Sequence, residues 1–230
     1  MEILHGNDVE TFKIKVDYTD LLKEWCKPLL EYLHSDKHSD LMYYLYKLYS
    51  PTNLNKKYLT KEELFKPYQL TPPDKTRVVM INFKPVFNKN SNGLAFANKT
   101  SFIESNHDEE LIDLFNDIEH YQDDGFKVDK DYSMESWAKQ GILLLNYPFV
   151  NIPELHRIKF YYLIKAVFEY LNQKTGIIFC LIGANNNYIT NNINETYNIL
   201  IEAYKLTYSV LETINHHIEK SNGKDFKIRW

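Results

Sequence analysis

Three short, continuous runs of apolar residues constrain the fold of this chain more than any other feature. They are Arg77–Asn82, Gly141–Asn146 and Ile177–Ile182, and a fourth segment, Tyr197–Ala203, has a similar character. A continuous apolar run of this length, bounded by turn residues, is typical of a strand that is covered on both faces. The sequence therefore predicts three buried strands and, in the fourth segment, a last strand of the same sheet.

Segments with helical periodicity separate these runs. Apolar residues recur at intervals of three and four over Asp17–Tyr49, with a break near His34–Asp36, and a short helix before Pro67 is expected to end at that proline. Further helices are predicted over Glu109–Tyr121, Met134–Lys139, Leu155–Leu171 and Tyr208–Lys220. Short apolar strands that alternate with helices favour βα crossovers. The predicted fold class is α/β, with a central, mainly parallel four-stranded sheet flanked by helices.

The order of the elements also predicts where a binding site lies. In open parallel sheets the crevice lies beyond the carboxyl ends of the strands. The residues that follow the four predicted strands are Asn82–Phe87, Asn146–Pro148, Gly183–Asn187 and Tyr204–Tyr208. We expect any chemistry of this chain to be found among them.

Composition narrows the class of protein. The 230 residues are 44% hydrophobic and 25% charged, which favours one globular domain over residues 1–230, with a helical N-terminal part (1–60) and an α/β core (61–230). The net charge of -4 argues against a surface that is a broad phosphate-binding field. No apolar run is long enough for a signal peptide or a membrane span, so we expect a soluble intracellular protein, cytoplasmic or nuclear, with no membrane partner.

Metal and cofactor chemistry has little support in the sequence. Cys26 and Cys180 are far apart and lack CxxC spacing. His216 and His217 are adjacent on a predicted helix, so their side chains point apart and no third ligand is evident. We expect no metal and no cofactor.

Several segments resemble the uracil-DNA glycosylase superfamily, family 1. Ser136–Asn146 is similar to the family's W-A-x-Q-G-V-L-L-L-N, and Gly93-Leu94-Ala95-Phe96 resembles its G-L-x-F. Weaker matches are Tyr68–Pro72 before the first strand, Asp124-Gly125-Phe126, and the ending Lys227–Trp230. Because the matches follow the family's order, the resemblance implies its fold. It also implies the family's chemistry, which is hydrolysis of the bond between uracil and deoxyribose after the nucleotide is flipped into a pocket.

The same resemblance implies that the catalytic residues are absent. The family motif G-Q-D-P-Y-H aligns with Asn82–Phe87, so Lys84 stands where the water-activating aspartate is expected, and an ammonium opposes the sugar cation that develops. The motif H-P-S-P-L-S aligns with Tyr204–Ser209, so Tyr204 replaces the electrophilic histidine. We expect no catalytic residues at these degenerate positions.

Other positions retain or alter the base pocket and the DNA contact. Asn146 matches the base-reading asparagine and Phe96 the stacking phenylalanine, while Phe83 and Val86 replace pocket residues of the family. Asn146 is as readily interpreted as a cap of a buried strand, and Phe96 as a core residue. Possible contacts to DNA or a partner are Lys84, Lys89, Lys205 and Tyr208, the last at the position of the family's intercalating leucine. The intercalating loop is expected to be missing, as is a Pro-rich phosphate-binding loop, whose place Ser101–Asp108 takes.

These observations favour a non-catalytic glycosylase homologue that acts as a protein- or DNA-binding module in DNA replication or repair, in a viral or mobile-element context or elsewhere. A protein partner from the replication or repair machinery is favoured over DNA, because the charge balance and the lost loop weaken DNA binding. One alternative is a divergent glycosylase with altered base specificity, which needs an open pocket with an acidic group near Asn146 and Phe96. A second alternative is a decoy that captures glycosylase inhibitors or partners.

Overall fold

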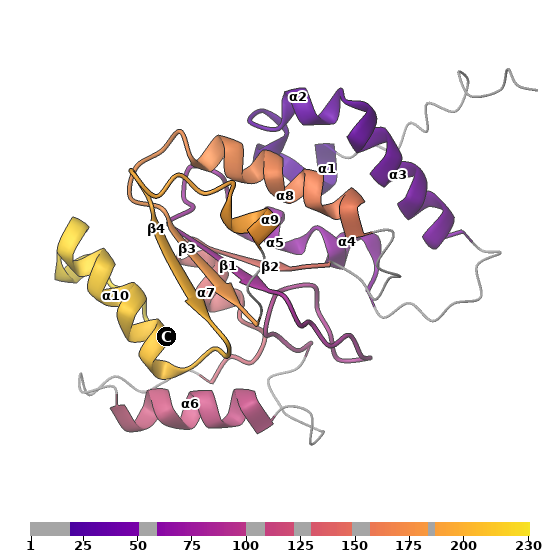
Figure 1. The fold of residues 1–230 in the computed structure, drawn as a ribbon. Helices are drawn as coiled ribbons and strands as arrows, with labels where there is room; N and C mark the ends of the chain where they lie inside the picture. The colour runs from indigo at the N-terminus through magenta and orange to yellow at the C-terminus, as the bar shows by residue number, and fades with distance from the viewer. Residues whose placement is uncertain (1–18, 51–58, 100–108, 122–129, 149–156, 184–186) are drawn as a thin grey trace, which may run out of the picture.

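The computed structural model describes residues 19–50, 59–99, 109–121, 130–148, 157–183 and 187–230 (Figure 1). Its centre is a four-stranded sheet in the order β2-β1-β3-β4. The strands are β1 (Val78–Asn82), β2 (Ile142–Asn146), β3 (Ile178–Ile182) and β4 (Ile199–Ala203). All three pairings are parallel. The predicted fold class is therefore confirmed, with every strand placed within a residue or two of its apolar run.

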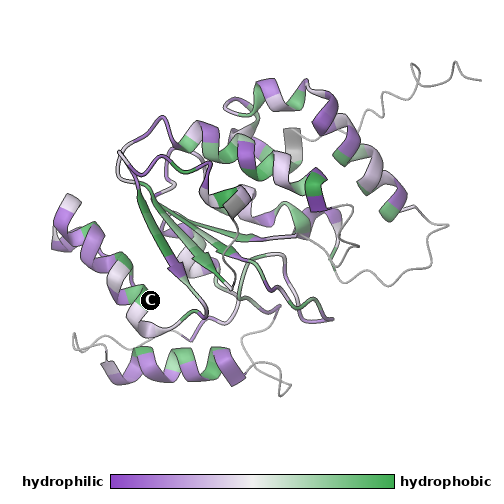
Figure 2. Cartoon of the chain, in the orientation of Figure 1, coloured by the Kyte–Doolittle hydropathy of each residue, from purple (hydrophilic) through white to green (hydrophobic). Residues whose placement is uncertain are grey.

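Helices cover both faces of the sheet. One face carries α1 (Thr19–Leu22), η2 (Lys23–Cys26), α2 (Leu30–Leu33), α3 (Asp36–Leu48), α4 (Lys61–Leu64), α5 (Lys66–Leu70), α8 (Arg157–Leu171) and α9 (Asn187–Thr190). The other face carries α6 (Glu109–Tyr121), α7 (Glu135–Lys139) and α10 (Tyr208–Asn222), and η5 (Lys224–Phe226) follows α10. The strands between these layers are the most uniformly hydrophobic part of the described chain (Figure 2).

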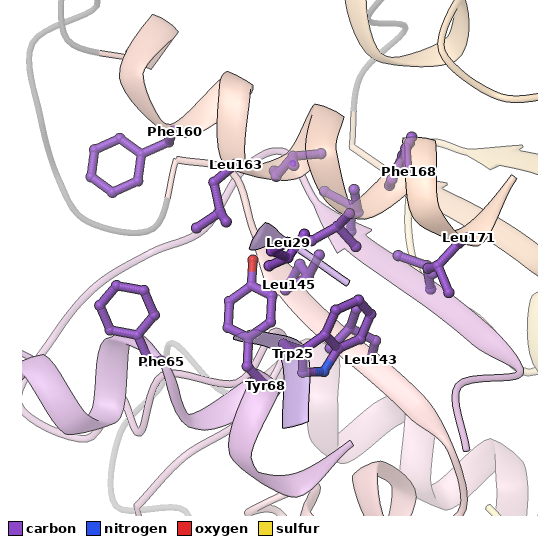
Figure 3. Close-up of a cluster of buried hydrophobic side chains, with 14 of the residues drawn as sticks. Trp25, Leu29, Phe65, Tyr68, Leu143, Leu145, Phe160, Leu163, Phe168 and Leu171 are labelled. Atoms are coloured by element: carbon purple, nitrogen blue, oxygen red, sulfur yellow. The ribbon is translucent and has the colours of Figure 1, made fainter. Parts of the chain in front are cut away.

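The alternation of side chains along each strand divides the interior into two cores. In β1, Val79 and Ile81 point to the face covered by α8, whereas Val78 and Met80 point to the face covered by α6 and α10. All four side chains are fully buried. On the α8 face, Trp25, Tyr68, Phe160 and Leu163 fill the space between the helices and the sheet (Figure 3). Burial on both faces explains why β1, β2 and β3 lack polar alternation, whereas the edge strand β4 is only partly buried and carries the exposed Glu202.

The N-terminal helices share the first of these cores with the sheet. The buried indole of Trp25 donates a hydrogen bond from Nε1 to the carbonyl of Thr71 at 2.8 Å. The Thr71 hydroxyl in turn lies within hydrogen-bonding distance of the carbonyls of Ala138 (3.1 Å) and Ile142 (3.0 Å). These contacts hold the helical N-terminal part to α7 and to the start of β2.

Local signals explain most helix boundaries, and one expectation was wrong. Ser35 caps α3 by accepting a hydrogen bond from the backbone of His38, which accounts for the predicted break. Thr60 and Glu63 form a capping box at the start of α4. Pro67, expected to end a helix, instead lies in the first turn of α5, where its missing N–H has no intrahelical partner to lose. The helix α9, inside an Asn-rich segment, was not predicted.

No helix within the described ranges is long and apolar enough to cross a membrane.

Candidate functional site

A cavity of about 550 Å³ opens at the carboxyl ends of the strands. Asn82 from β1, Asn146 from β2, Gly183 after β3 and Tyr204 after β4 all contribute to its wall. Leu111 and Leu114 of α6 close the opposite side. The cavity lies beyond the parallel strands β1 and β3, whose following connections lead to opposite edges of the sheet, to β2 and to β4. This switch point is the expected place for a ligand in a fold of this class. All four segments predicted from the strand order thus supply at least one wall residue.

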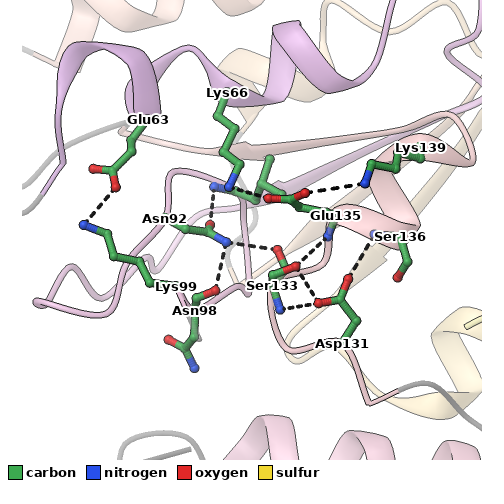
Figure 4. Close-up of polar contacts among 11 residues, drawn as sticks. Glu63, Lys66, Asn92, Asn98, Lys99, Asp131, Ser133, Glu135, Ser136 and Lys139 are labelled. Atoms are coloured by element: carbon green, nitrogen blue, oxygen red, sulfur yellow. Dashed lines mark hydrogen bonds and ion pairs between the residues drawn. The ribbon is translucent and has the colours of Figure 1, made fainter. Parts of the chain in front are cut away.

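A hydrogen-bonded loop over residues 91–98 forms one wall (Figure 4). The side chain of Asn92 is only 3% exposed. Its Nδ2 donates to the carbonyls of Asn98 (2.9 Å) and Ser133 (3.0 Å), and its Oδ1 accepts from the backbone N–H of Leu94 (3.0 Å). One amide therefore closes the loop on itself and ties it to the segment before α7.

Asp131 stabilises that segment. Its carboxylate accepts hydrogen bonds from the backbone N–H groups of Ser133 (3.0 Å) and Ser136 (3.1 Å) and from the Ser133 hydroxyl. Partial burial acts to raise the pKa of Asp131, but these hydrogen bonds outweigh burial and lower the pKa below its ordinary value. The charged form of Asp131 thus holds the backbone that Asn92 binds.

Gly93 brings the loop against the backbone of α4. Its φ of +97° lies in the left-handed region, and a Cβ at this position would sit 1.8 Å from the carbonyl oxygen of Glu63. The Glu63 side chain also forms an ion pair with Lys99 (2.8 Å) at the far end of the same loop. Only glycine permits this approach, because the neighbouring atom belongs to a backbone and cannot rotate away.

Phe96 faces the cavity from a strained backbone. Its φ is +60°, a region that a bulky residue rarely occupies. The ring is half-buried, packs against the core on the α6 side and lines the cavity. A conformation of this kind costs of the order of 1–3 kcal/mol and persists only where the surroundings enforce it. Phe96 is therefore both a core residue and a cavity wall, so neither of the two interpretations of the sequence excludes the other.

Asn146 lies at the base of the cavity with 5% of its surface exposed. Its Nδ2 donates a long hydrogen bond of 3.3 Å to the carbonyl of Gly93. An amide carries two N–H donors and an acceptor oxygen. The contact with Gly93 engages one donor, and the group remains suited to reading the edge of a planar ligand.

Lys84 and Tyr204 meet across the mouth of the cavity. The Lys84 ammonium lies 4.1 Å from the centroid of the Tyr204 ring, a cation–π contact. The backbone N–H of Lys84 donates to the side-chain oxygen of Asn82 at 2.9 Å, which fixes the turn after β1. The two positions that the resemblance assigns to the catalytic aspartate and histidine are thus neighbours, occupied by a cation and a phenol ring.

Carboxylates also reach the mouth of the cavity. Glu109 and Glu110, in the first turn of α6, line it, and Glu110 pairs with Lys205 at 3.6 Å. Both partners of this pair are substantially exposed. The sequence analysis did not predict Glu109 and Glu110 as site residues. Helical periodicity gives the position of α6 in the sequence but not which of its ends lies at the carboxyl edge of the sheet.

The remaining predicted residues divide between the cavity and other places. Val86 is 74% exposed at the mouth, and Phe87 lines the cavity while also packing against the core on the α8 side. Phe83 packs edge-on against Tyr147, with ring centroids 5.8 Å apart, in the core on the α8 face. Because side chains alternate along an extended segment, Phe83 follows Ile81 to that face and is not part of the cavity wall.

Tyr208 and Lys89 lie outside the cavity wall. Tyr208 is the first residue of α10, and its ring stacks on that of Tyr121 with centroids 5.3 Å apart. Residues 204–207 alone join β4 to α10, so this connection is short. Lys89 is exposed on the loop after β1. The Ser101–Asp108 segment and Asp124–Phe126 fall outside the described residues.

Metal-binding groups are not found in the part of the chain that the structure describes, where no three His, Cys, Asp or Glu side chains could hold an ion together. His216 and His217 have ring centroids 6.0 Å apart on α10.

Comparisons with known proteins place this architecture among the uracil-DNA glycosylases. No protein-family model matches the chain. The uracil-DNA glycosylase of Lactococcus lactis is 26% identical over 132 residues, which cover 57% of this chain and 56% of the relative. That of Mesomycoplasma hyopneumoniae is 25% identical over 173 residues, covering 72% and 76%. The chain thus spans little more than half the length of the first of these relatives.

Solved structures agree in fold over nearly the whole chain. The mimivirus uracil-DNA glycosylase superposes with a TM-score of 0.69 at 16% identity, covering 100% of this chain and 95% of that one. A mimivirus UNG variant in complex with UGI gives a TM-score of 0.71 at 17% identity, covering 94% and 91%. At these identities the structural likeness concerns the fold alone.

Proposed function

We propose that this chain is a non-catalytic member of the uracil-DNA glycosylase superfamily, one that binds without excising a base; its likeness to these glycosylases in sequence and fold supports the proposal. In this proposal it serves as a protein- or DNA-binding module in DNA replication or repair. The contact between Lys84 and Tyr204 carries the proposal. Excision needs a carboxylate to position water beneath the sugar and a donor to stabilise the departing base.

The electrostatics at the mouth of the cavity support this proposal. Lys84 stands at the sequence position where the resemblance implies the aspartate, and its ammonium lies 4.1 Å from the centroid of the Tyr204 ring. A positive charge there repels the oxocarbenium-like sugar that forms as the glycosidic bond breaks. Tyr204 is 81% exposed, so its hydroxyl is not held against the position of a departing base.

The test is release of uracil from single- and double-stranded oligonucleotides that contain one uracil. We expect no release by the unmodified chain above the protein-free background. The double variant Lys84→Asp with Tyr204→His restores both expected groups and should gain measurable release. Lys89→Asp makes the same charge change as Lys84→Asp farther along the same loop, outside the cavity wall, and should gain none. Release by the unmodified chain would refute the proposal.

One observation favours a second candidate, a divergent glycosylase with altered base specificity. The cavity is open, Asn146 and Phe96 line it, and Glu109 and Glu110 supply carboxylates at its mouth. An acidic group near these two residues is what this alternative requires. Its test is excision from oligonucleotides that carry thymine or damaged pyrimidines, repeated with Glu109→Gln and Glu110→Gln. Activity that either substitution abolishes would establish the enzyme in place of the binding module.

A further inference from the structure

Tyr204 is the most exposed of the large apolar or aromatic side chains in the described residues. It follows the last residue of β4, is 81% exposed, and lies at the mouth of the cavity. Aromatic rings that remain largely exposed at a site commonly form contacts with a ligand or partner. The position of Tyr204 at the carboxyl edge of the sheet connects its ring with the cavity rather than with a remote surface.

Lys84 prepares this ring for stacking. Its ammonium lies 4.1 Å from the centroid of the Tyr204 ring. The lysine stem passes Gly183, where a Cβ would lie only 3.3 Å from Lys84 Cγ, and Gly183 has a φ of +103°. The small residue after β3 therefore leaves room for the lysine to reach the ring. A ring covered on one side by a cation presents its opposite side to an incoming flat group.

We propose that Tyr204, supported by Lys84, is a stacking platform for an unpaired base of single-stranded DNA. This inference rests on the proposed function, since it identifies the ligand of the same non-catalytic site. Bases of any type present a π face, so stacking on a tyrosine tolerates different sequences. The Lys84 ammonium also gives the platform a charge that attracts the adjoining phosphate.

The cavity beside the platform suits a strand rather than a duplex. Val86 extends the exposed apolar surface at the mouth, and the half-buried ring of Phe96 lies further in. Residues 204–207 form a short connection between β4 and α10, which leaves little chain to enter the stack of a duplex. A base that is already unpaired needs no such wedge, because no pairing must be broken.

The charges around the platform predict a shallow dependence on salt. Lys84 and Lys205 line the mouth, but Glu109 and Glu110 line it as well, and Glu110 pairs with Lys205. With no more than about two phosphate contacts, affinity for a single strand should fall about sevenfold between 50 and 200 mM salt. Stacking therefore dominates the expected affinity.

The experiment is fluorescence anisotropy of a labelled 15-nucleotide oligothymidine, compared with a duplex of the same length, on the full chain. Tyr204→Leu should weaken binding of the single strand about 5- to 150-fold, the range expected for one stacked base. Tyr204→Phe keeps the ring and should bind nearly as well as the unmodified chain. Tyr197→Leu is the matched control, since Tyr197 is 58% exposed and lies before the other end of β4.

The outcomes separate this inference from the proposed function. Equal losses in Tyr204→Leu and Tyr197→Leu, tighter binding of the duplex, or no binding of the oligothymidine would overturn the platform, and the last result would direct attention to a protein partner. None of these three results bears on whether the chain excises uracil, so the proposed absence of catalysis would stand. Uracil release by the unmodified chain would instead overturn the proposed function while leaving the stacking measurement to stand by itself.

Discussion

Replacing Gly93 with alanine tests whether the cavity wall is held against the backbone of α4. The new Cβ would lie 1.8 Å from the Glu63 carbonyl oxygen. The left-handed φ of +97° costs an alanine about 1–2 kcal/mol, and forcing two backbones apart adds about 1–3 kcal/mol. The sum, about 2–5 kcal/mol, corresponds to a fall in Tm of about 4–20 °C for a domain of this size.

Gly176→Ala is the matched control. Gly176 also has a positive φ, +78°, but nothing lies within 4 Å of the position of its Cβ. This variant should lose only the conformational part, about 1–2 kcal/mol. Unfolding in urea, followed by circular dichroism, gives both free energies. A loss in Gly93→Ala no greater than in Gly176→Ala would refute the close approach of the loop to α4.

Three further predictions follow from buried, charged and connecting groups. Burial lowers the pKa of His38 from 6.5 to about 4. As the pH falls from 7 to 4, this imidazole therefore takes up a proton more readily in the unfolded chain than in the folded one, and the free energy of unfolding should fall by about 3 kcal/mol. His38→Gln should remove that part of the pH dependence of urea unfolding. Glu110→Gln frees Lys205 and should tighten oligothymidine binding up to about fivefold, measured by anisotropy. The resemblance implies that glycosylase inhibitors grip the intercalating loop, and residues 204–207, the whole connection between β4 and α10, leave no room for that loop. Size-exclusion chromatography should therefore show no stable complex with UGI, and co-elution would favour the decoy alternative.

The fold was predictable because its signals are local and mutually consistent. The apolar runs at 77–82, 141–146 and 177–182 are short and bounded by turn residues, which favours strands buried on both faces, and β1, β2 and β3 lie within them. The prediction for Pro67 was wrong because a proline can either follow the end of a helix or lie in the first turn of one, and the residues around Pro67 are compatible with both. The short helix α9 lacks the length over which helical periodicity can be recognised.

The site was predictable only in part. Lys84, Asn146 and Tyr204 line the cavity, as their positions at the ends of the strands suggest, and Phe96 lines it as the resemblance implies. Glu109 and Glu110 arrive from a helix on the other side of the cavity, which no strand order reveals. Phe83 was expected in the pocket but packs in the core on the α8 face. Successive side chains of an extended segment point to opposite sides, so a shift of one residue decides whether a side chain faces the cavity or that core.

We propose that this chain holds single-stranded DNA without cutting the glycosidic bond. The most direct measurement is a single-turnover reaction in which the chain is in excess over a single-stranded oligonucleotide with one labelled uracil. We predict that the oligonucleotide is bound and then recovered intact, with no free uracil and no alkali-sensitive abasic site. Stoichiometric release of uracil from the bound strand would contradict it.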